Sequence, residues 1–182
     1  MRPLRPPVAA ALSVSFVDAA FVCSTAYCVS LFGVMLLPPV AWRRAVVASL
    51  WTYAPLALLY LALLCLSWQP DTLSLMLPGS LEEGMRTGAP QFFPQLACIV
   101  ELLQRRVTAA SAWAHLLAVN AFLGRHIYLD GARCRVGVAH SLLLSLFAGP
   151  AGLASHLATK AVVLGLRKVL SARRRRLTVT AS

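Results

Sequence analysis

All four histidines of this 182-residue chain, His115, His126, His140 and His156, lie in its C-terminal half. Histidine titrates near neutral pH and can donate or accept a proton, so histidines inside apolar helices are candidate acid–base groups. We expect His115, His140 and His156 to carry such chemistry. His126, beside Arg125 near a predicted helix end, is expected to have no special role. The alternative is that these side chains only hydrogen-bond between helices and hold them together.

The spacing of these residues argues against a metal site. His115 and His126 are eleven residues apart, which places them on one helix face but roughly 16 Å apart along its axis, too far for one metal ion. The five cysteines include no CxxC pair, and GxSxG, HExxH and P-loop motifs are absent. We therefore expect no metal and no cofactor. A haem or metal bound by histidines from different helices is the less favoured alternative.

The composition indicates an integral membrane protein. Hydrophobic residues make up 59% and charged residues 13% of the sequence, and its mean hydropathy is +0.72. A typical soluble domain has about 45–50% apolar and about 25% charged residues. The net charge of +11 does not indicate nucleic-acid binding, because the basic residues flank the apolar runs and form no stripe interleaved with aromatic residues.

Four apolar runs are each long enough to cross a bilayer, which takes about 20 residues. The runs cover approximately residues 12–37, 46–68, 108–128 and 138–166. Pro55 lies within the second run and should bend it. The runs predict an all-α fold, an integral membrane four-helix bundle over residues 12–168. A basic segment at 1–11 precedes this membrane domain, and a basic tail at 169–182 follows it.

A short amphipathic helix is expected before the third span. Leu96, Ile99, Val100 and Leu103 follow the i, i+3, i+4, i+7 pattern of one helix face. This helix should lie in the membrane surface, or else pack on the bundle. Four spans place both chain ends on one side. That side carries more Lys and Arg, and should face the cytoplasm of a bacterium or the stroma of a plastid.

The third and fourth spans contain most of the polar groups that interrupt the apolar runs. A short loop over residues 130–133 should join the two spans, so we expect them to run antiparallel. His156 and Lys160, four residues apart, share one helix face. Gly149 and Pro150 should kink the fourth helix. Together these features predict a polar cavity between the third and fourth spans.

Several motifs in this region are distinctive in their order. They are Ser111-Ala112-Trp113-Ala114-His115-Leu116-Leu117, then Phe122, Arg125, Tyr128, Asp130 and Gly131, then His140-Ser141-Leu142, Gly149-Pro150-Ala151-Gly152-Leu153, Ser155-His156 and Thr159-Lys160. The chain resembles the neoxanthin synthase family, the abscisic-acid-deficient-four-like membrane proteins. The similarity extends upstream to about Tyr60 and includes Ser67-Trp68-Gln69-Pro70-Asp71-Thr72-Leu73.

This resemblance implies a chloroplast isomerase of carotenoid biosynthesis that converts the xanthophyll violaxanthin to neoxanthin, an abscisic acid precursor. The reaction opens an epoxide and removes a proton from the adjacent polyene carbon, giving an allene and a tertiary alcohol without a redox cofactor. His115, His140 and His156 would supply the acid and the base. The resemblance also implies a set of substrate-binding side chains: Trp113, Asn120, Arg125, Tyr128, Asp130 and Lys160.

One position departs from the family, which usually carries Asp where this chain has Asn120. If that Asp is catalytic or binds a cation, the activity of this chain would be altered. If it only forms hydrogen bonds, Asn can replace it.

A second class of function stays open: a non-catalytic membrane protein that binds a pigment or lipid, or supports assembly of a membrane complex. The expected partners are the lipid bilayer, a hydrophobic carotenoid-like substrate and other membrane proteins, and no nucleic acid. The expected location is a plastid membrane in a eukaryote or the inner membrane in a bacterium.

Overall fold

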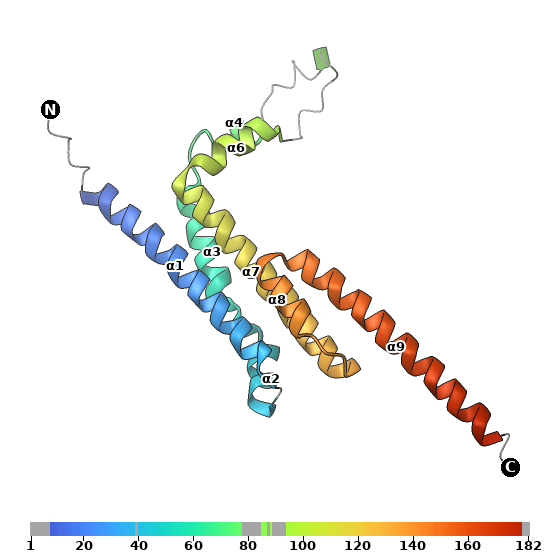
Figure 1. Cartoon of the computed structure of the whole chain (residues 1–182). Helices are drawn as coiled ribbons and strands as arrows, with labels where there is room; N and C mark the ends of the chain where they lie inside the picture. The colour runs from blue at the N-terminus through green and yellow to red at the C-terminus, as the bar shows by residue number, and fades with distance from the viewer. Residues whose placement is uncertain (1–7, 39, 78–84, 87, 89–93, 180–182) are drawn as a thin grey trace. The chain divides into compact units, whose positions relative to one another are not determined.

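The computed structural model describes residues 8–38, 40–77, 85–86, 88 and 94–179. Within these residues the protein is all-helical and contains no strand. The helices follow in chain order (Figure 1): α1 (Val8–Leu36), α2 (Ala41–Ala48), η1 (Leu50–Thr52), α3 (Ala54–Ser67), α4 (Thr72–Met76), α6 (Leu96–Gln104), α7 (Arg106–Cys134), α8 (Ala139–Phe147) and α9 (Gly149–Val179).

Two of the described helices are long and apolar enough to cross a membrane by length and composition. They are Phe16–Leu36 of α1, with a mean hydropathy of 1.9, and α7, with a mean hydropathy of 1.3. α3 is also apolar but has only 14 residues. The all-helical prediction is therefore confirmed, whereas the bundle of four membrane spans stays a prediction.

The chain divides into two compact units, and α1 and α7 each contribute to both. Unit 1 lies within Met1–Ala26 and Pro55–Leu116, and unit 2 within Tyr27–Ala54 and Leu117–Ser182. Unit 1 has an apolar core in which Val17 of α1 and Leu63 of α3 pack with Ala114 of α7. The small alanine side chain lets the helices approach closely, and the aliphatic side chains fill the space between them.

The second apolar run is not one bent helix. It contains the end of α2, then η1, and then α3. Ser49 is extended between the first two helices, and Pro55 occupies the second position of α3. A proline in the first helical turn costs no intrahelical hydrogen bond, because the backbone N–H groups there have no acceptor in any case. The second run therefore has no bend at Pro55. Instead, its helix is interrupted before Pro55, between Ala48 and Ala54.

The third run forms a longer helix than predicted, and the prediction of a loop at residues 130–133 is wrong. α7 continues through Cys134 and ends where Arg135 takes a left-handed backbone conformation, with φ of 53°. The N–H of Val136 then donates to the carbonyl of Gly131 at 3.0 Å. This six-residue hydrogen-bonded closure is a common way for a helix to end. It leaves Asp130 inside the last turns of α7, facing other helices.

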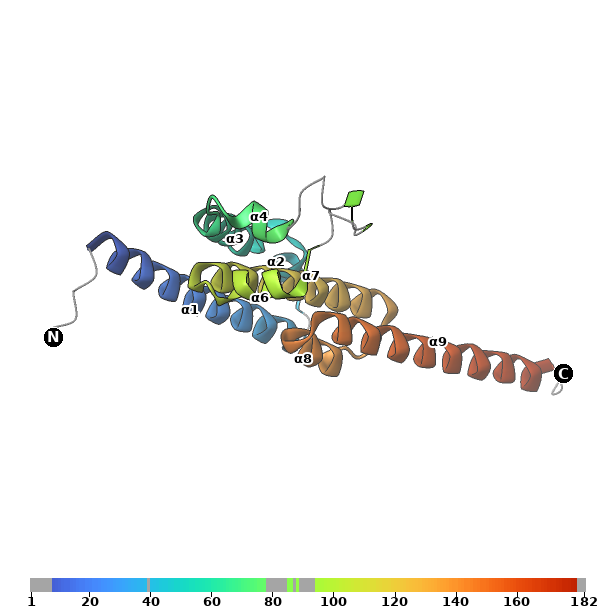
Figure 2. The same ribbon diagram turned by 90° about the horizontal axis from the view of Figure 1, so that it is seen from above.

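The fourth run differs most from expectation, because Gly149 and Pro150 do more than kink a helix. The chain stops being helical at Ala148 and reverses direction, so that α8 and α9 form an antiparallel hairpin within unit 2 (Figure 1, Figure 2). α8 has nine residues and is roughly 14 Å long, less than half the thickness of a bilayer core. α9 extends to Val179, so the predicted tail is helical up to that residue.

The hairpin changes the direction of the last helix relative to α7. Asn120 of α7 bonds the start of α9 at Gly149, whereas Asp130, further along α7, bonds Lys160. α9 therefore runs parallel to α7, and only α8 runs antiparallel to it. The expected antiparallel arrangement of the third and fourth helices is wrong for the segment that carries His156. The amphipathic helix predicted around Leu96–Leu103 is present as α6; its place at a membrane surface stays a prediction.

Candidate functional site

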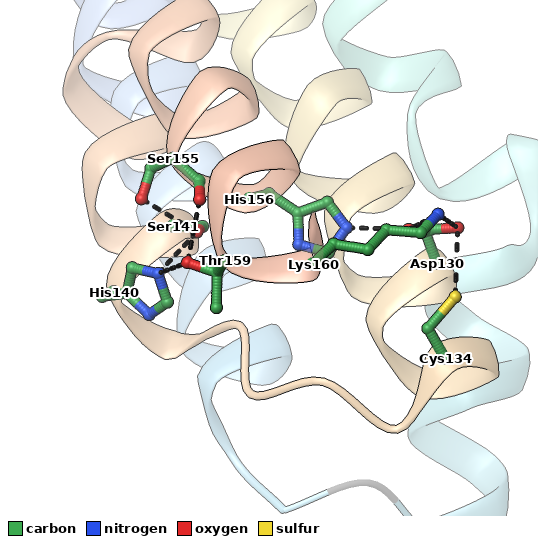
Figure 3. A network of polar contacts seen from close by, with 8 residues as sticks. All are labelled: Asp130, Cys134, His140, Ser141, Ser155, His156, Thr159 and Lys160. Atoms are coloured by element: carbon green, nitrogen blue, oxygen red, sulfur yellow. Dashed lines mark hydrogen bonds and ion pairs between the residues drawn. The ribbon is translucent and has the colours of Figure 1, made fainter. Parts of the chain in front are cut away.

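The candidate site in unit 2 is built on a four-residue spacing in α9. Ser155 and Thr159 form one stripe, and His156 and Lys160 form the next. Side chains four residues apart lie one above the other on a helix, and neighbouring stripes are separated by about 100°. The first stripe therefore contacts α8, and the second contacts α7 (Figure 3).

Asp130 of α7 is the centre of the second stripe. Its Oδ2 lies 2.8 Å from Nε2 of His156 and 2.8 Å from Nζ of Lys160, and its Oδ1 lies 2.9 Å from the same Nζ (Figure 3). The exposed fraction of these side chains is 0% for His156, 19% for Asp130 and 29% for Lys160. A carboxylate that has lost most of its contact with water needs cations or donors around it, and here both are present.

The partners of His156 determine which of its nitrogens carries the proton. The Asp130 carboxylate is only an acceptor, so Nε2 of His156 donates to it. Nδ1 of His156 is buried and has no hydrogen-bond partner among the described residues. Nδ1 therefore presents a free lone pair in the neutral imidazole. A carboxylate that orients one nitrogen of a histidine while the other stays free is the arrangement of a general base.

His140 belongs to a separate group of hydroxyl side chains between α8 and α9. Its Nε2 lies 2.9 Å from Oγ1 of Thr159 and 3.1 Å from Oγ of Ser141. Thr159 donates its own proton to the carbonyl of Ser155, and Ser141 donates to Oγ of Ser155. Both hydroxyl oxygens thus accept from Nε2–H of His140. The ring is otherwise exposed, so this group ties the hairpin together at its open end.

Asn120 holds the closed end of the hairpin. Its Oδ1 accepts from the N–H of Gly149 at 3.1 Å, and its Nδ2 donates to the carbonyl of Leu146 at 3.3 Å. The Gly149 N–H lies at the start of α9, and the Leu146 carbonyl lies at the end of α8. Backbone groups at helix ends have no partner inside their own helix. Both amide atoms of Asn120 are therefore used by the backbone. The structure gives this side chain a structural role, and its predicted contact with substrate stays a prediction.

The remaining predicted residues do not join this centre. In unit 2, Arg125 donates to the carbonyl of Ala48 at 2.8 Å, and the ring of Tyr128 is buried against a different part of the unit. In unit 1, Trp113 donates to Oγ1 of Thr25, and the exposed ring of His115 packs against Tyr60. The structure thus brings together three of the nine predicted site residues: Asp130, His156 and Lys160.

Sequence reasoning missed the hydroxyl groups Ser141, Ser155 and Thr159. The signal that could have found two of them is their spacing. Ser155 and Thr159 are four residues apart, like His156 and Lys160, and each comes one position earlier in the chain. The sequence therefore could have predicted two adjacent polar stripes on the same helix. In the described part of the chain, no group of three or more His, Cys, Asp or Glu side chains is placed to bind a metal ion.

Comparison with known proteins identifies the family of the chain. The profile of the ABA DEFICIENT 4-like family matches residues 19–156, which takes in α7, α8 and the first turns of α9. The protein named ABA DEFICIENT 4, chloroplastic, of Arabidopsis thaliana is 36% identical over 111 residues, which is 61% of this chain and 46% of the relative. The chain thus matches less than half the length of that relative. No solved structure matches the chain significantly. Because the family profile covers most of the sequence, the chain belongs to the ABA DEFICIENT 4-like family.

Proposed function

We propose that this protein is a membrane isomerase of carotenoid metabolism that converts a violaxanthin-type epoxide to a neoxanthin-type allene. Its place would be a plastid membrane or, in a bacterium, the inner membrane. Family membership supports the carotenoid role. The observation that carries the chemical part is the Asp130–His156–Lys160 network with its free, buried Nδ1.

The distribution of apolar side chains supports a membrane environment. Large apolar residues are exposed along α1, α3 and α9, for example Val22 at 62%, Leu58 at 66% and Val162 at 61%. Water would disfavour such a surface, whereas lipid chains solvate it. A carotenoid dissolves in the same lipid, so it would reach the protein sideways from the bilayer.

The network can supply both proton transfers that the reaction needs. Lys160 gives a proton to the epoxide oxygen as the C–O bond breaks, which yields the tertiary alcohol. Nδ1 of His156 removes the proton from the adjacent polyene carbon, and that electron pair forms the new double bond of the allene. His156 then holds one extra proton and Lys160 lacks one. Asp130 is bonded to both and is the route by which the proton returns. No atom is gained or lost.

Burial places one requirement on this mechanism. The His156 side chain is fully buried, so the helices around it must part before a substrate can reach Nδ1. The same burial favours a second candidate function, a pigment-binding protein in which the network only stabilises α9 against α7. The two candidates differ in whether a product is formed.

The test is expression of the chain in cells that make violaxanthin, followed by pigment analysis. We expect a new allenic xanthophyll with the wild type, none with the empty vector, and none with Asp130→Asn. Asp18→Asn, which changes an exposed carboxylate of unit 1, is the matched control and should keep the product. Wild-type protein present in membranes without any allenic product would contradict the isomerase and leave the pigment-binding alternative.

A further inference from the structure

Unit 2 contains a second candidate site that the Asp130 network does not use. A cavity of about 630 Å³ lies between the end of α1, the start of α2, the end of α7 and the start of α8. Most of its wall is aliphatic, with contributions from Met35, Val136 and Leu142. This volume is within the roughly 300–1,000 Å³ of small-molecule sites, and such a wall suits an apolar chain.

A buried phenol without a partner lies in the wall of this cavity. Tyr128 has an exposed fraction of 4%, and its hydroxyl has no hydrogen-bond partner among the described residues. A buried hydroxyl that forms no hydrogen bond costs on the order of 1–3 kcal/mol, so buried hydroxyls are normally paired. A ligand with an oxygen acceptor in the cavity would pair it.

Among the described residues, the wall of the cavity also has two arginines and no acidic residue. Arg44 of α2 and Arg135, just after α7, are both exposed at its edge. No described residue forms a hydrogen bond or ion pair with either guanidinium. The neighbouring Arg167 instead donates to the carbonyls of Cys134 and Arg135 at 2.7 Å each, which fixes the backbone that carries the Arg135 side chain. Two unpaired guanidiniums are typical of recognition of phosphate or another anion.

We propose that this cavity binds an anionic membrane lipid. Its acidic head group would lie at Arg44 and Arg135, and the part of its acyl chain nearest the head group would lie along the aliphatic wall. The phenol of Tyr128 donates to an oxygen of the bound lipid. The charge of the cavity favours an anionic lipid over the neutral, hydroxylated ring of a xanthophyll. This site is independent of the proposed isomerase activity, because none of the three network side chains lines the cavity.

The test measures thermal unfolding of the purified full chain in neutral detergent micelles while a lipid is titrated in. Phosphatidylglycerol is the anionic probe, and phosphatidylcholine is the neutral one. A ligand that binds only the folded state raises Tm with a saturable dependence on its concentration. We expect this for phosphatidylglycerol and not for phosphatidylcholine. Each lost charge-assisted contact should weaken binding by about ten-fold, so we expect the double variant Arg44→Gln/Arg135→Gln to show almost no saturable shift.

Two further variants separate the site from general surface charge. Arg133→Gln removes an exposed arginine at the same end of α7 that does not line the cavity, and should bind like the wild type. Tyr128→Phe keeps the buried ring and removes only the hydroxyl, so it should fold normally and bind several-fold more weakly. If Arg133→Gln reduced the phosphatidylglycerol-dependent Tm shift as much as the double variant does, the proposal would be overturned. So would an equal Tm shift from inorganic phosphate alone, because the lipid chain would then contribute nothing.

Discussion

In unit 1 the charged pair of Asp18 and Arg106 is exposed, whereas in unit 2 a charged network lies between packed helices. The side chains of Asp18 and Arg106 are 49% and 61% exposed, and unit 1 is stabilised by an apolar core. In unit 2, Asp130 is 19% exposed and its partner His156 is fully buried. Exposed pairs contribute little to folding, while a buried pair loses its hydration and costs several kcal/mol unless its geometry is good.

This difference is the reason why we propose that function is concentrated in unit 2. The apolar core of unit 1 needs nothing beyond helix packing to explain it. The polar groups of unit 2 need a reason to be retained, because an apolar side chain of similar size would often be as stable. A free, buried Nδ1 on His156 stabilises nothing by itself, and the reason that we propose for keeping it is proton transfer at that atom. The predictions below test the comparison from the largest expected effect to the smallest.

The topology of unit 2 gives an all-or-none prediction. Because α8 reverses at Ala148 and α9 runs parallel to α7, the loop at Gly137 and the chain beyond Val179 should lie on the same side of a membrane. Four complete spans would place them on opposite sides. Single cysteines introduced at those two positions, in a background without the five native cysteines, can be labelled with an impermeant reagent. Labelling from opposite sides would contradict the hairpin.

Close packing of the hairpin predicts the largest loss of stability. A Cβ at Gly152 would lie 2.5 Å from the backbone nitrogen of Ser145 and 2.6 Å from the carbonyl oxygen of Ser141. Gly152→Leu should therefore force α8 and α9 apart and lower the free energy of unfolding by up to about 3 kcal/mol. Gly165→Leu, on the same helix with nothing within 4 Å, is the matched control. Equal Tm values for both variants would show that the hairpin is not packed this way.

Asn120 should contribute an intermediate amount. Asn120→Ala leaves the Gly149 N–H and the Leu146 carbonyl without partners, which should cost about 1–2 kcal/mol in the free energy of unfolding. Asn120→Asp should cost less. It keeps the acceptor for Gly149 and adds a negative charge at the N-terminus of α9, which the helix dipole favours. An Asp variant less stable than the Ala variant would contradict this role.

The exposed pair in unit 1 gives the smallest effect, one that depends on pH. The hydrogen bond from the Arg105 guanidinium holds the pKa of Asp71 below its ordinary value. The pair therefore stabilises the fold above the pKa of unfolded Asp71, and this contribution is lost as the pH falls through the folded pKa. The Tm difference between wild type and Asp71→Asn should be small at pH 7 and vanish in acid. If the Tm difference between wild type and Asp71→Asn grew in acid, the Asp71–Arg105 pair would not stabilise the fold in the way described.

The sequence predicted the elements more successfully than their directions. Helix periodicity was sufficient for α6, and the spacing of His156 and Lys160 was sufficient to place both on one face. The sequence alone could not show that the chain reverses at Gly149, because the same Gly-Pro pair can either kink a helix or end it. The outcome depends on Asn120, a residue far away in the chain whose amide bonds both ends of the break. For the same reason Asp130, expected in a loop, is a half-buried partner of His156.

The most direct test of the central claim compares two histidines of unit 2 in the violaxanthin-producing cells. His156→Gln can keep the hydrogen bond to Asp130 but cannot exchange a proton, whereas His126→Gln changes an exposed ring that forms no hydrogen bond with the network residues. General acid–base catalysis supplies about 10²–10⁴-fold. Normalised to the protein in membranes, we expect allenic product to fall by that factor in His156→Gln and to be unchanged in His126→Gln. Near-normal product from both variants would contradict an acid–base role for His156.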